Sequence, residues 1–298
     1  MMTIQEQVEL KDYTSWLVGG RADYFCLPQS EGEIIEALNY AQNKNIPWSI
    51  LSGGSNVLIS DEGVEGLVIC LRQYTGITID DSGAVLRLDC CAGTGKSDLL
   101  KIFLKYKLAP ALFLAGLPGD VGGVVVMNAG VAESFMPREF HEIVEWVEIL
   151  RPTDEGIKKV RLSGQEIHWS YRHSSGWQPG VISRVGICWD LFRDETILER
   201  VREANRIRLS KQPLDMPSCG SVFVNPPGHK SAQLIDRCGL KGFQVGGAQV
   251  STKHANFIVN RGTATARDIL DVISHVQRTV KASEGVDLQT EVVRMGRW

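Results

Sequence analysis

Hydrophobic spacing in the first 60 residues indicates a helix followed by short strands. Ser30 and Glu33 form the Ser-x-x-Glu pattern that opens a helix. Apolar residues then recur on one helical face: Ile34, Leu38 and Ala41. Residues 46–51 and 57–59 are short and mostly apolar, which predicts two buried strands separated by a small-residue loop.

The middle of the chain combines predicted strands with one helix. Strand-like runs cover residues 66–70, 85–91, 143–150, 160–162 and 181–191. Ser97 is expected to cap a helix with apolar residues facing inward: Leu100, Phe103 and Leu104. The apolar stretch 108–127 is long enough to span a bilayer, but its prolines, glycines and Asp120 disfavour a lipid-exposed helix. We expect a buried, glycine-rich turn system there.

The C-terminal third predicts a smaller unit. Thr196 and Glu199 should cap a helix that ends near Leu209 and acts as a linker. Beyond it we expect a helix at 231–238 stopped by Gly239, a strand at 256–260, a helix at 265–282 and a terminal strand at 286–292. The alternation in that strand places Glu291 away from the core side. This order of elements predicts α+β domains.

Composition narrows the class of protein. Of the 298 residues, 43% are hydrophobic and 22% are charged, which excludes a disordered chain. The net charge of -3 includes no long run of one sign, which weakens the case for a general nucleic-acid or membrane-surface binder. The N-terminal residues include Glu6 and Glu9 and lack the apolar core of a signal peptide.

Cysteine and histidine spacing favours neither a disulfide framework nor a metal site. The seven cysteines are an odd number without a Cys-x-x-Cys pair, so free thiols in a reducing cytosol are favoured. The six histidines have no ligand-like spacing. We therefore expect a cytoplasmic protein with no bound metal.

Two segments have the character of a phosphate site. The loop Gly53-Gly54-Ser55-Asn56 lets the backbone approach an anion, and its last two residues supply donors. The glycine-rich residues 116–123 precede residues 124–130, which are expected to open a helix with amide groups directed at a pyrophosphate. Neither segment has Walker or Rossmann spacing, so each alone also fits a simple turn. Asp120 would repel a phosphate unless it turned away or capped the helix.

Three isolated polar residues are candidates for chemistry. Arg172 can clamp a carboxylate through two parallel hydrogen bonds. Ser221 places a hydroxyl between a glycine and an apolar pair, and Glu291 supplies a carboxyl. Taken singly, these residues are more often an ion-pair partner, a turn residue and a solvated strand residue. A catalytic role requires that all three converge.

Several short segments follow one another in a distinctive order: Leu17–Ala22, Gly53–Asn56, Ala115–Gly119 with Met127–Gly130, Ser170–Ser174, Pro217–Phe223, Gly246–Ser251 and Glu291–Val292. In this order they resemble the UDP-N-acetylenolpyruvoylglucosamine reductase (MurB) family. They extend over nearly the whole chain, and their combined order is highly specific. The resemblance implies a flavoenzyme of cytoplasmic peptidoglycan precursor synthesis that uses FAD and NADPH.

The resemblance also implies a fold and a set of site residues. Residues 1–65 and 66–195 would form a two-part FAD-binding domain of the vanillyl-alcohol oxidase type, and residues 196–298 a substrate domain. The catalytic set would be Arg172, Ser221 and Glu291. FAD would be held by Gly53, Gly54, Ser55, Asn56, Gly116, Pro118, Gly119, Gly122, Gly123, Asn128 and Ala129. The short connection after Ser175 is typical of the shorter class of the family, which lacks an inserted lobe.

In the implied reaction, NADPH reduces FAD, and hydride then passes to the enolpyruvyl ether of UDP-N-acetylglucosamine to give UDP-N-acetylmuramate. Arg172 would stabilise the charge that develops on the substrate carboxylate. Glu291, partly buried and with a raised pKa, would share a proton with it. Ser221 would supply the proton that completes the reduction.

Two alternatives stay open: another FAD-dependent oxidoreductase, such as an oxygen-using alcohol oxidase, and a non-catalytic flavin-binding module. Ser15, Asp120 and Val224 depart from the residues usual in the family, a threonine, a small hydroxyl residue and a lysine respectively. The expected partner is the enolpyruvyl nucleotide sugar, with no nucleic acid, no membrane insertion and a monomeric state.

Overall fold

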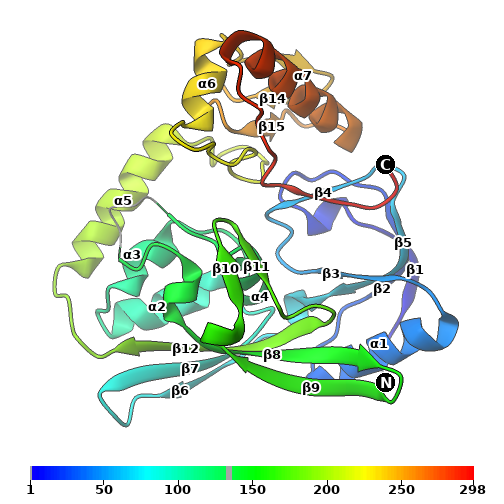
Figure 1. Ribbon diagram of the computed structural model, residues 1–298, viewed down its shortest axis with the longest axis vertical. Helices are drawn as coiled ribbons and strands as arrows, with labels where there is room; N and C mark the ends of the chain where they lie inside the picture. Colours follow the sequence, from blue (N-terminus) through cyan, green and yellow to red (C-terminus); the bar gives the residue numbers. More distant parts are fainter. Residues whose placement is uncertain (1, 132–135) are drawn as a thin grey trace. The chain divides into compact units, whose positions relative to one another are not determined.

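The computed structural model describes residues 2–131 and 136–298, and the chain forms two compact units (Figure 1). Unit 1 contains the residues up to Gln5, Phe25–Gly53 and Gly66–Arg206. Unit 2 contains Glu6–Tyr24, Gly54–Glu65 and Ile207–Trp298. Each unit is therefore assembled from separate stretches of sequence. The expected three-part division at 65/66 and 195/196 follows sequence order and stays a prediction.

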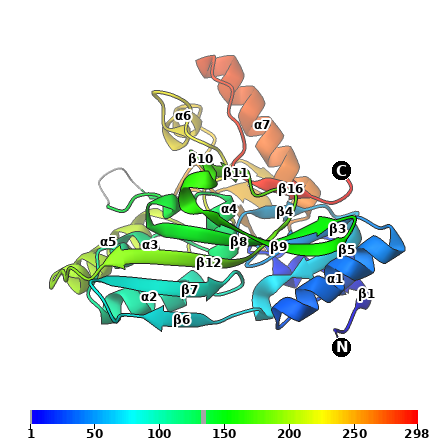
Figure 2. The same cartoon turned by 60° about the horizontal axis from the view of Figure 1, so that its bottom comes forward.

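Unit 1 is built around an antiparallel five-stranded sheet of order β6-β7-β12-β8-β9 (Figure 2). Its strands are β6 Ile77–Asp80, β7 Val85–Cys91, β8 Val144–Thr153, β9 Gly156–Ser163 and β12 Val181–Asp190. Strands β8 and β9 form a hairpin in which Trp146 pairs with Ser163 and Thr153 with Gly156. Strand β12 is paired on both edges, and most of its residues are buried, as expected for a central strand.

Short helices accompany this sheet. They are α2 Lys96–Lys105, α3 Pro110–Ala115 and α4 Val121–Val126. Every residue of α3 is buried, and α4 packs against β7 and β12. A two-stranded hairpin, β10 His168–Ser170 with β11 His173–Ser175, also contacts α4 through β11. The hairpin therefore brings residues 171 and 172 to the same part of unit 1 as the glycine-rich segment.

A four-stranded sheet has the order β1-β2-β5-β3. Its strands are β1 Gln5–Glu9, β2 Arg21–Cys26, β3 Trp48–Leu51 and β5 Val64–Cys70. Strands β3 and β5 run parallel, with Trp48 opposite Leu67. Helix α1 Glu31–Lys44 provides the crossover before β3, and it begins where the Ser30 side chain accepts a 3.3 Å hydrogen bond from the Glu33 amide.

Unit 2 packs the amphipathic helix α7 Ala266–Glu284 against the small sheet β13-β14-β15 (Figure 1). The strands are β13 Gln244–Val245, β14 Ala248–Val250 and β15 Ile258–Asn260, and α6 Ser231–Arg237 also contacts α7. The buried face of α7 contains Ala266, Ile269, Val272, Ile273, Val276 and Val280. Strand β16 Val293–Met295 pairs in parallel with β4 Val57–Ile59, and α5 Ile197–Lys211 leads into the unit along the chain.

The strongly periodic elements confirm the sequence predictions. Helices α1, α5, α6 and α7 and strands β3, β4, β5, β7, β8, β9, β12 and β15 lie within a few residues of the expected ranges. In α2 the cap prediction was wrong, because the N-cap is Gly95, and Leu99 is buried beside Phe103 where Leu100 was expected.

Two other expectations were also wrong. Residues 110–115 and 121–126 form the helices α3 and α4, where a turn system was predicted. The predicted strand 286–292 has only an isolated bridge between Thr290 and Phe223, and the strand β16 begins afterwards at Val293. Its alternation is nevertheless visible in burial, since Leu288 and Val292 are buried while Asp287 and Gln289 are exposed.

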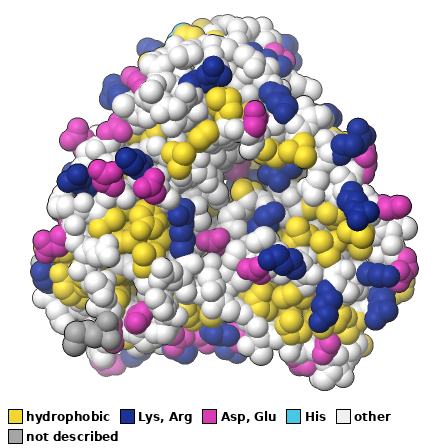
Figure 3. All heavy atoms as spheres, turned by 180° about the vertical axis from the view of Figure 1, so that it is seen from behind, with side chains coloured by type: hydrophobic (Ala, Val, Ile, Leu, Met, Phe, Trp, Pro, Cys, Tyr) yellow, Lys and Arg dark blue, Asp and Glu magenta, His cyan; other side chains and the backbone are white. Residues whose placement is uncertain are grey.

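Within the described residues, no helix has both the length and the apolar character needed to cross a bilayer. Basic and acidic side chains are interspersed over the face shown in Figure 3, with apolar patches between them. The seven cysteines are free thiols, and burial raises the pKa of Cys26 to about 12 and that of Cys70 to about 11.

Candidate active site

The first glycine-rich loop is held in unit 1 by Arg72 and Asp120. Arg72 donates from Nε to the Ser52 carbonyl at 3.1 Å and from Nη2 to the Gly53 carbonyl at 3.2 Å. The Ser52 hydroxyl donates to Asp120 Oδ2 at 2.7 Å. A Cβ on Gly53 would lie 3.3 Å from the Asp120 carboxylate oxygens, so this position fits a residue without a side chain.

Asp120 thus turns toward the loop. It occupies the N-cap position of α4, yet within the described residues its side chain caps no amide of that helix. Burial raises the pKa of Asp120, while the hydrogen bond from Ser52 and the charge of Arg72 oppose that shift. A carboxyl with a raised pKa repels a neighbouring phosphate less than an ordinary aspartate would, because it is ionised to a smaller extent at a given pH.

The second glycine-rich segment is more tightly packed than the sequence suggested. Helix α4 starts at Val121, where residues 124–130 were expected to open a helix, so that boundary was wrong. Its first amides are not free for a pyrophosphate, because Val121 donates to the Thr94 carbonyl at 2.9 Å and Gly122 to the Ala92 carbonyl at 2.8 Å. Packing explains Gly122, since a Cβ there would lie 3.0 Å from that of Ala92.

Gly123, unlike the packed Gly122, is open to its surroundings. A Cβ at this position would meet no described heavy atom within 4 Å, so bare backbone faces open space. Such a surface permits close approach of a flat or phosphate-bearing group. The glycine-rich segment of unit 1 therefore has an open backbone surface at Gly123, while Gly122 is explained by packing.

The remainder of the glycine-rich loop belongs to unit 2. Gly54 has φ +62°, and a Cβ would lie 2.0 Å from the Tyr13 carbonyl oxygen, so only glycine fits. The Ser15 amide donates to the Gly54 carbonyl at 3.0 Å, which fixes the loop from its other side. Ser15, where a threonine was expected, uses its backbone for this contact.

Asn56 connects this loop to the C-terminal segment of unit 2. Its side-chain amide donates to the Glu291 carbonyl at 3.1 Å, and its own carbonyl accepts from the Val293 amide at 3.0 Å. Asn56 was expected to contact a cofactor. In the structure, its side chain binds the backbone of Glu291, a candidate catalytic residue.

Ser221 and Glu291 lie on neighbouring segments of unit 2. The Glu291 amide donates to the Val222 carbonyl at 2.8 Å, and the Val224 amide donates to the Gln289 carbonyl at 3.0 Å. The two segments therefore run side by side, and residues 221 and 291 lie next to this ladder of hydrogen bonds. Both residues are half-buried.

The Ser221 segment is held by Asn256 and adjoins open space at Gly220. Asn256 accepts from the Phe223 amide at 2.9 Å and donates to the Phe223 carbonyl at 2.9 Å, while its own carbonyl accepts from the Val222 amide. Gly220 has φ +84°, and a Cβ there would meet no described heavy atom within 4 Å. Ser221 is thus anchored on one side and adjoins open space on the other.

Burial raises the pKa of the Cys219 thiol well above its ordinary value, and the charge of Glu291 adds to this rise. Val224, which stands where a lysine was expected, contributes its backbone, accepting from the Ser231 hydroxyl at 2.6 Å.

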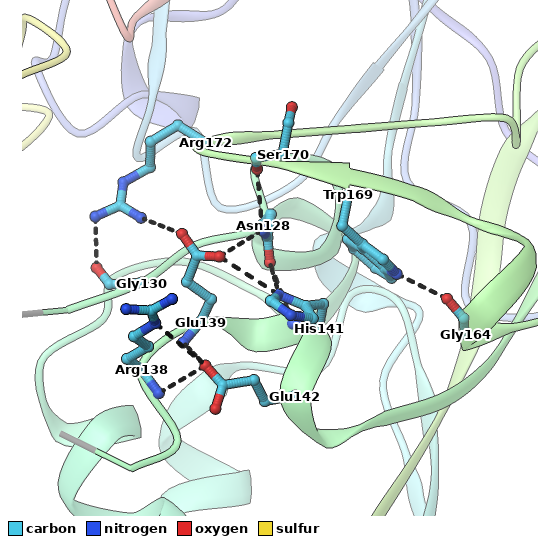
Figure 4. Close-up of polar contacts among 10 residues, drawn as sticks. All are labelled: Asn128, Gly130, Arg138, Glu139, His141, Glu142, Gly164, Trp169, Ser170 and Arg172. Atoms are coloured by element: carbon cyan, nitrogen blue, oxygen red, sulfur yellow. Dashed lines mark hydrogen bonds and ion pairs between the residues drawn. The ribbon is translucent and has the colours of Figure 1, made fainter. Parts of the chain in front are cut away.

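Arg172 belongs to unit 1, at the turn of the β10–β11 hairpin. It adopts φ +58°, a conformation that is strained for a residue with a side chain. The hairpin is fastened to α4, since the Ser174 hydroxyl donates to the Val126 carbonyl at 3.1 Å. Figure 4 shows the guanidinium directed at Gly130 and Glu139, and the Arg172 side chain is only 16% exposed.

The structure thus brings Ser221 and Glu291 together in unit 2, and it places Arg172 and the residues 116–129 in unit 1. Three residues that hold candidate residues in place were not predicted from the sequence: Arg72, Glu139 and Asn256. Their spacing gives no signal, because each acts on a segment that is distant in sequence. In the described part of the chain, no cluster of three or more metal-binding side chains occurs.

Comparison with known proteins covers nearly the whole chain. Residues 22–158 match an FAD binding domain, and residues 212–295 match the C-terminal domain of UDP-N-acetylenolpyruvoylglucosamine reductase. The proteins of that name from Heliobacterium modesticaldum and Moorella thermoacetica are both 40% identical to this chain, over 98% and 95% of its length and 90% of theirs.

A solved structure agrees with these matches. The crystal structure of UDP-N-acetylenolpyruvylglucosamine reductase (MurB) from Thermus caldophilus has a TM-score of 0.81 and 34% identity, covering 99% of this chain and 100% of that one. The predicted α+β class, with an FAD-binding domain followed by a C-terminal domain, is confirmed. Residues 176–180 alone separate β11 from β12, which leaves no room for an inserted lobe. The chain belongs to the UDP-N-acetylenolpyruvoylglucosamine reductase (MurB) family.

Proposed function

We propose that this chain catalyses the NADPH-dependent reduction of UDP-N-acetylglucosamine enolpyruvate to UDP-N-acetylmuramate, a step of peptidoglycan precursor synthesis in the cytoplasm. The observation that carries the proposal is the 40% identity to reductases of that name over 98% of the chain. We further propose that the protein acts as a monomer, without nucleic-acid or membrane partners.

We assign the FAD site to the two glycine-rich segments. The candidate residues are Gly53, Gly54, Ser55, Asn56, Gly116, Pro118, Gly119, Gly122, Gly123, Asn128 and Ala129. When bound, FAD accepts hydride from NADPH and supplies it to the substrate. The open backbone at Gly123 supports this assignment, because a cofactor can approach the chain there without meeting a side chain.

Arg172 would bind the substrate carboxylate. Hydride addition to the methylene carbon of the enolpyruvyl group pushes electron density toward the carboxylate, which then carries additional negative charge. A guanidinium is permanently cationic, and its five N–H donors can serve a bound carboxylate and protein acceptors together. A cation held in a largely buried position stabilises that charge more strongly than one in water.

Glu291 would share a proton with the same developing charge. This role requires the protonated form of the carboxyl. Its backbone is fixed at both the amide and the carbonyl, by Val222 and Asn56. The backbone that carries the carboxyl is therefore fixed, which limits the positions that the carboxyl can take beside the substrate.

Ser221 would donate the proton to the carbon next to the carboxylate. A serine hydroxyl is a weak acid in water, but a carbanion-like centre beside it is a strong base, and a fixed geometry removes much of the entropic cost. The anchored backbone of residues 222 and 223 supports this assignment. Solvent can then return a proton to the hydroxyl.

The choice of oxidant tests the proposal. Holoprotein is first reduced with NADPH under anaerobic conditions. One sample is then mixed with the enolpyruvyl nucleotide sugar without oxygen, and a second sample is mixed with oxygen without the sugar. We expect the sugar to restore the flavin absorbance much faster than oxygen does. Faster reoxidation by oxygen indicates an oxidase, and no reoxidation by the sugar indicates a flavin-binding protein without this activity.

A further inference from the structure

A polar network in unit 1 surrounds Arg172 (Figure 4). The Arg172 Nη2 donates to the Gly130 carbonyl at 2.9 Å, and Nη1 lies 3.8 Å from Glu139 Oε1. Both side chains of this ion pair are largely buried, 16% exposed for Arg172 and 18% for Glu139. The guanidinium centre also lies 4.6 Å from the ring centroid of Tyr171. The orientation of the guanidinium is therefore restrained from several directions.

Asn128 holds the other oxygen of Glu139. Its side-chain amide nitrogen donates to Glu139 Oε2 at 3.1 Å and to the Ser170 carbonyl at 3.0 Å. Its amide oxygen accepts from the His141 backbone at 3.2 Å. Asn128 is fully buried and has φ +38°, so the surrounding structure fixes its conformation. Glu139 Oε1 thus faces Arg172, while Oε2 accepts from Asn128 and lies 3.5 Å from His141 Nδ1. The Glu139 side chain also accepts from the Glu142 amide, so the carboxylate is held from several sides.

Gly130 sets the distance between Arg172 and the backbone. A Cβ at this position would lie 2.7 Å from Arg172 Nη1 and 2.7 Å from the Arg138 carbonyl oxygen. Only glycine lets the guanidinium lie against the chain here. The Gly130 backbone therefore both binds the Arg172 guanidinium and limits how far it can move toward the chain.

We propose that Glu139, anchored by Asn128, is a positioning residue that fixes the guanidinium of Arg172 for the substrate carboxylate. The inference rests on the proposed function of Arg172. Glu139 reduces the net positive charge at the site, so its benefit must come from orientation. A flexible arginine would lose the geometry of two parallel hydrogen bonds to a carboxylate, and displacement of about 1 Å can lower a rate by about 100-fold.

A double-mutant cycle in the holoenzyme tests this inference. Glu139→Ala, Arg172→Ala and the double variant are compared in two half-reactions: flavin reduction by NADPH, and flavin reoxidation by the enolpyruvyl nucleotide sugar. We expect Glu139→Ala to slow reoxidation by about 10- to 100-fold and to change flavin reduction by less than about twofold. In the Arg172→Ala background, the same change should slow reoxidation by less than about twofold.

Glu145→Ala is the matched control, because this carboxylate forms an exposed ion pair with Arg87 at 3.0 Å elsewhere in unit 1. It should leave both half-reactions unchanged. If Glu139→Ala does not fold, Glu139→Gln replaces it. The amide keeps the side-chain volume but has one acceptor oxygen where the carboxylate has two, and we expect a smaller, equally non-additive loss.

The outcomes separate the two proposals. If Arg172→Ala slows reoxidation and Glu139→Ala does not, or if the Glu139 effect is the same in both backgrounds, the positioning role is wrong while the role of Arg172 stands. If Arg172→Ala reoxidises at the wild-type rate, the proposed role of Arg172 is wrong, and the role of Glu139 falls with it.

Discussion

Asparagine side chains hold all three candidate catalytic segments. Asn56 donates to the Glu291 carbonyl, Asn256 pairs with the backbone of Phe223, and Asn128 donates to the Ser170 carbonyl next to the Arg172 turn. From the sequence, Asn56 and Asn128 were predicted to contact a cofactor, and their hydrogen bonds to peptide groups were not predicted. A side-chain amide suits a ligand and a peptide group equally well, so the residue type alone does not identify the partner.

The proposed role of Ser221 predicts a selective defect. Ser221→Ala removes the proton donor and leaves the backbone anchors at Val222 and Phe223 intact. We expect flavin reduction by NADPH to be nearly unchanged and reoxidation by the enolpyruvyl sugar to fall by at least about 100-fold, the range typical of a lost general acid. Stopped-flow absorbance measures both steps. Equal losses in the two half-reactions would remove Ser221 from this role.

Asp120 predicts a pH dependence of stability. Its ordinary pKa is 3.8, and burial raises it in the folded chain, so the folded state binds this proton more tightly than the unfolded state. The stabilising contribution is complete below 3.8 and is lost as the pH rises through the raised pKa. Asp120→Asn keeps an acceptor for Ser52 and should remove this loss.

The free energy of unfolding of the apoprotein is measured with urea, from a pH below 3.8 to a pH above the raised pKa of Asp120. The stability of Asp120→Asn relative to wild type should increase as the pH rises above 3.8. A difference between the two proteins that stays constant with pH would contradict the account.

At the scale of elements, long periodic segments were predictable and short ones were not. Helix α7 follows its apolar spacing, with a Thr265–Asp268 capping box at its start and Gly285 at its end. Helix α4 has the sequence Val-Gly-Gly-Val-Val-Val, whose residues are poor helix formers. It forms because Thr94 and Ala92, distant in sequence, accept its first amides, and this tertiary contact leaves no local pattern.

A second long-range cap gives an element-scale prediction. The Asp61 carboxylate accepts from the Ala266 and Arg267 amides, at 2.9 Å each, in the first turn of α7. Asp61→Ala leaves these amides without the cap and should cost about 1 kcal/mol of stability. Thermal unfolding measures the loss. Asp271→Ala, in the same helix, breaks only an exposed ion pair with Arg267 and should have a smaller effect; equal effects would argue against the cap.

At the scale of the whole chain, segment order was more informative than local pattern. Residues 6–24 and 54–65 join the C-terminal part in unit 2, and β4 pairs with β16 from the other end of the sequence. Periodicity describes neighbours along the chain, so it cannot reveal such partners. The ordered motifs did indicate the family, because they are spread over both units and were compared together, in their order along the chain.

The most direct test of the central claim is an anaerobic spectral titration of the purified holoprotein. The account predicts oxidised flavin bands that bleach on addition of NADPH and return with one equivalent of UDP-N-acetylglucosamine enolpyruvate, yielding UDP-N-acetylmuramate. Bands that stay bleached in the presence of that sugar, or that return without formation of the lactyl ether, would contradict it.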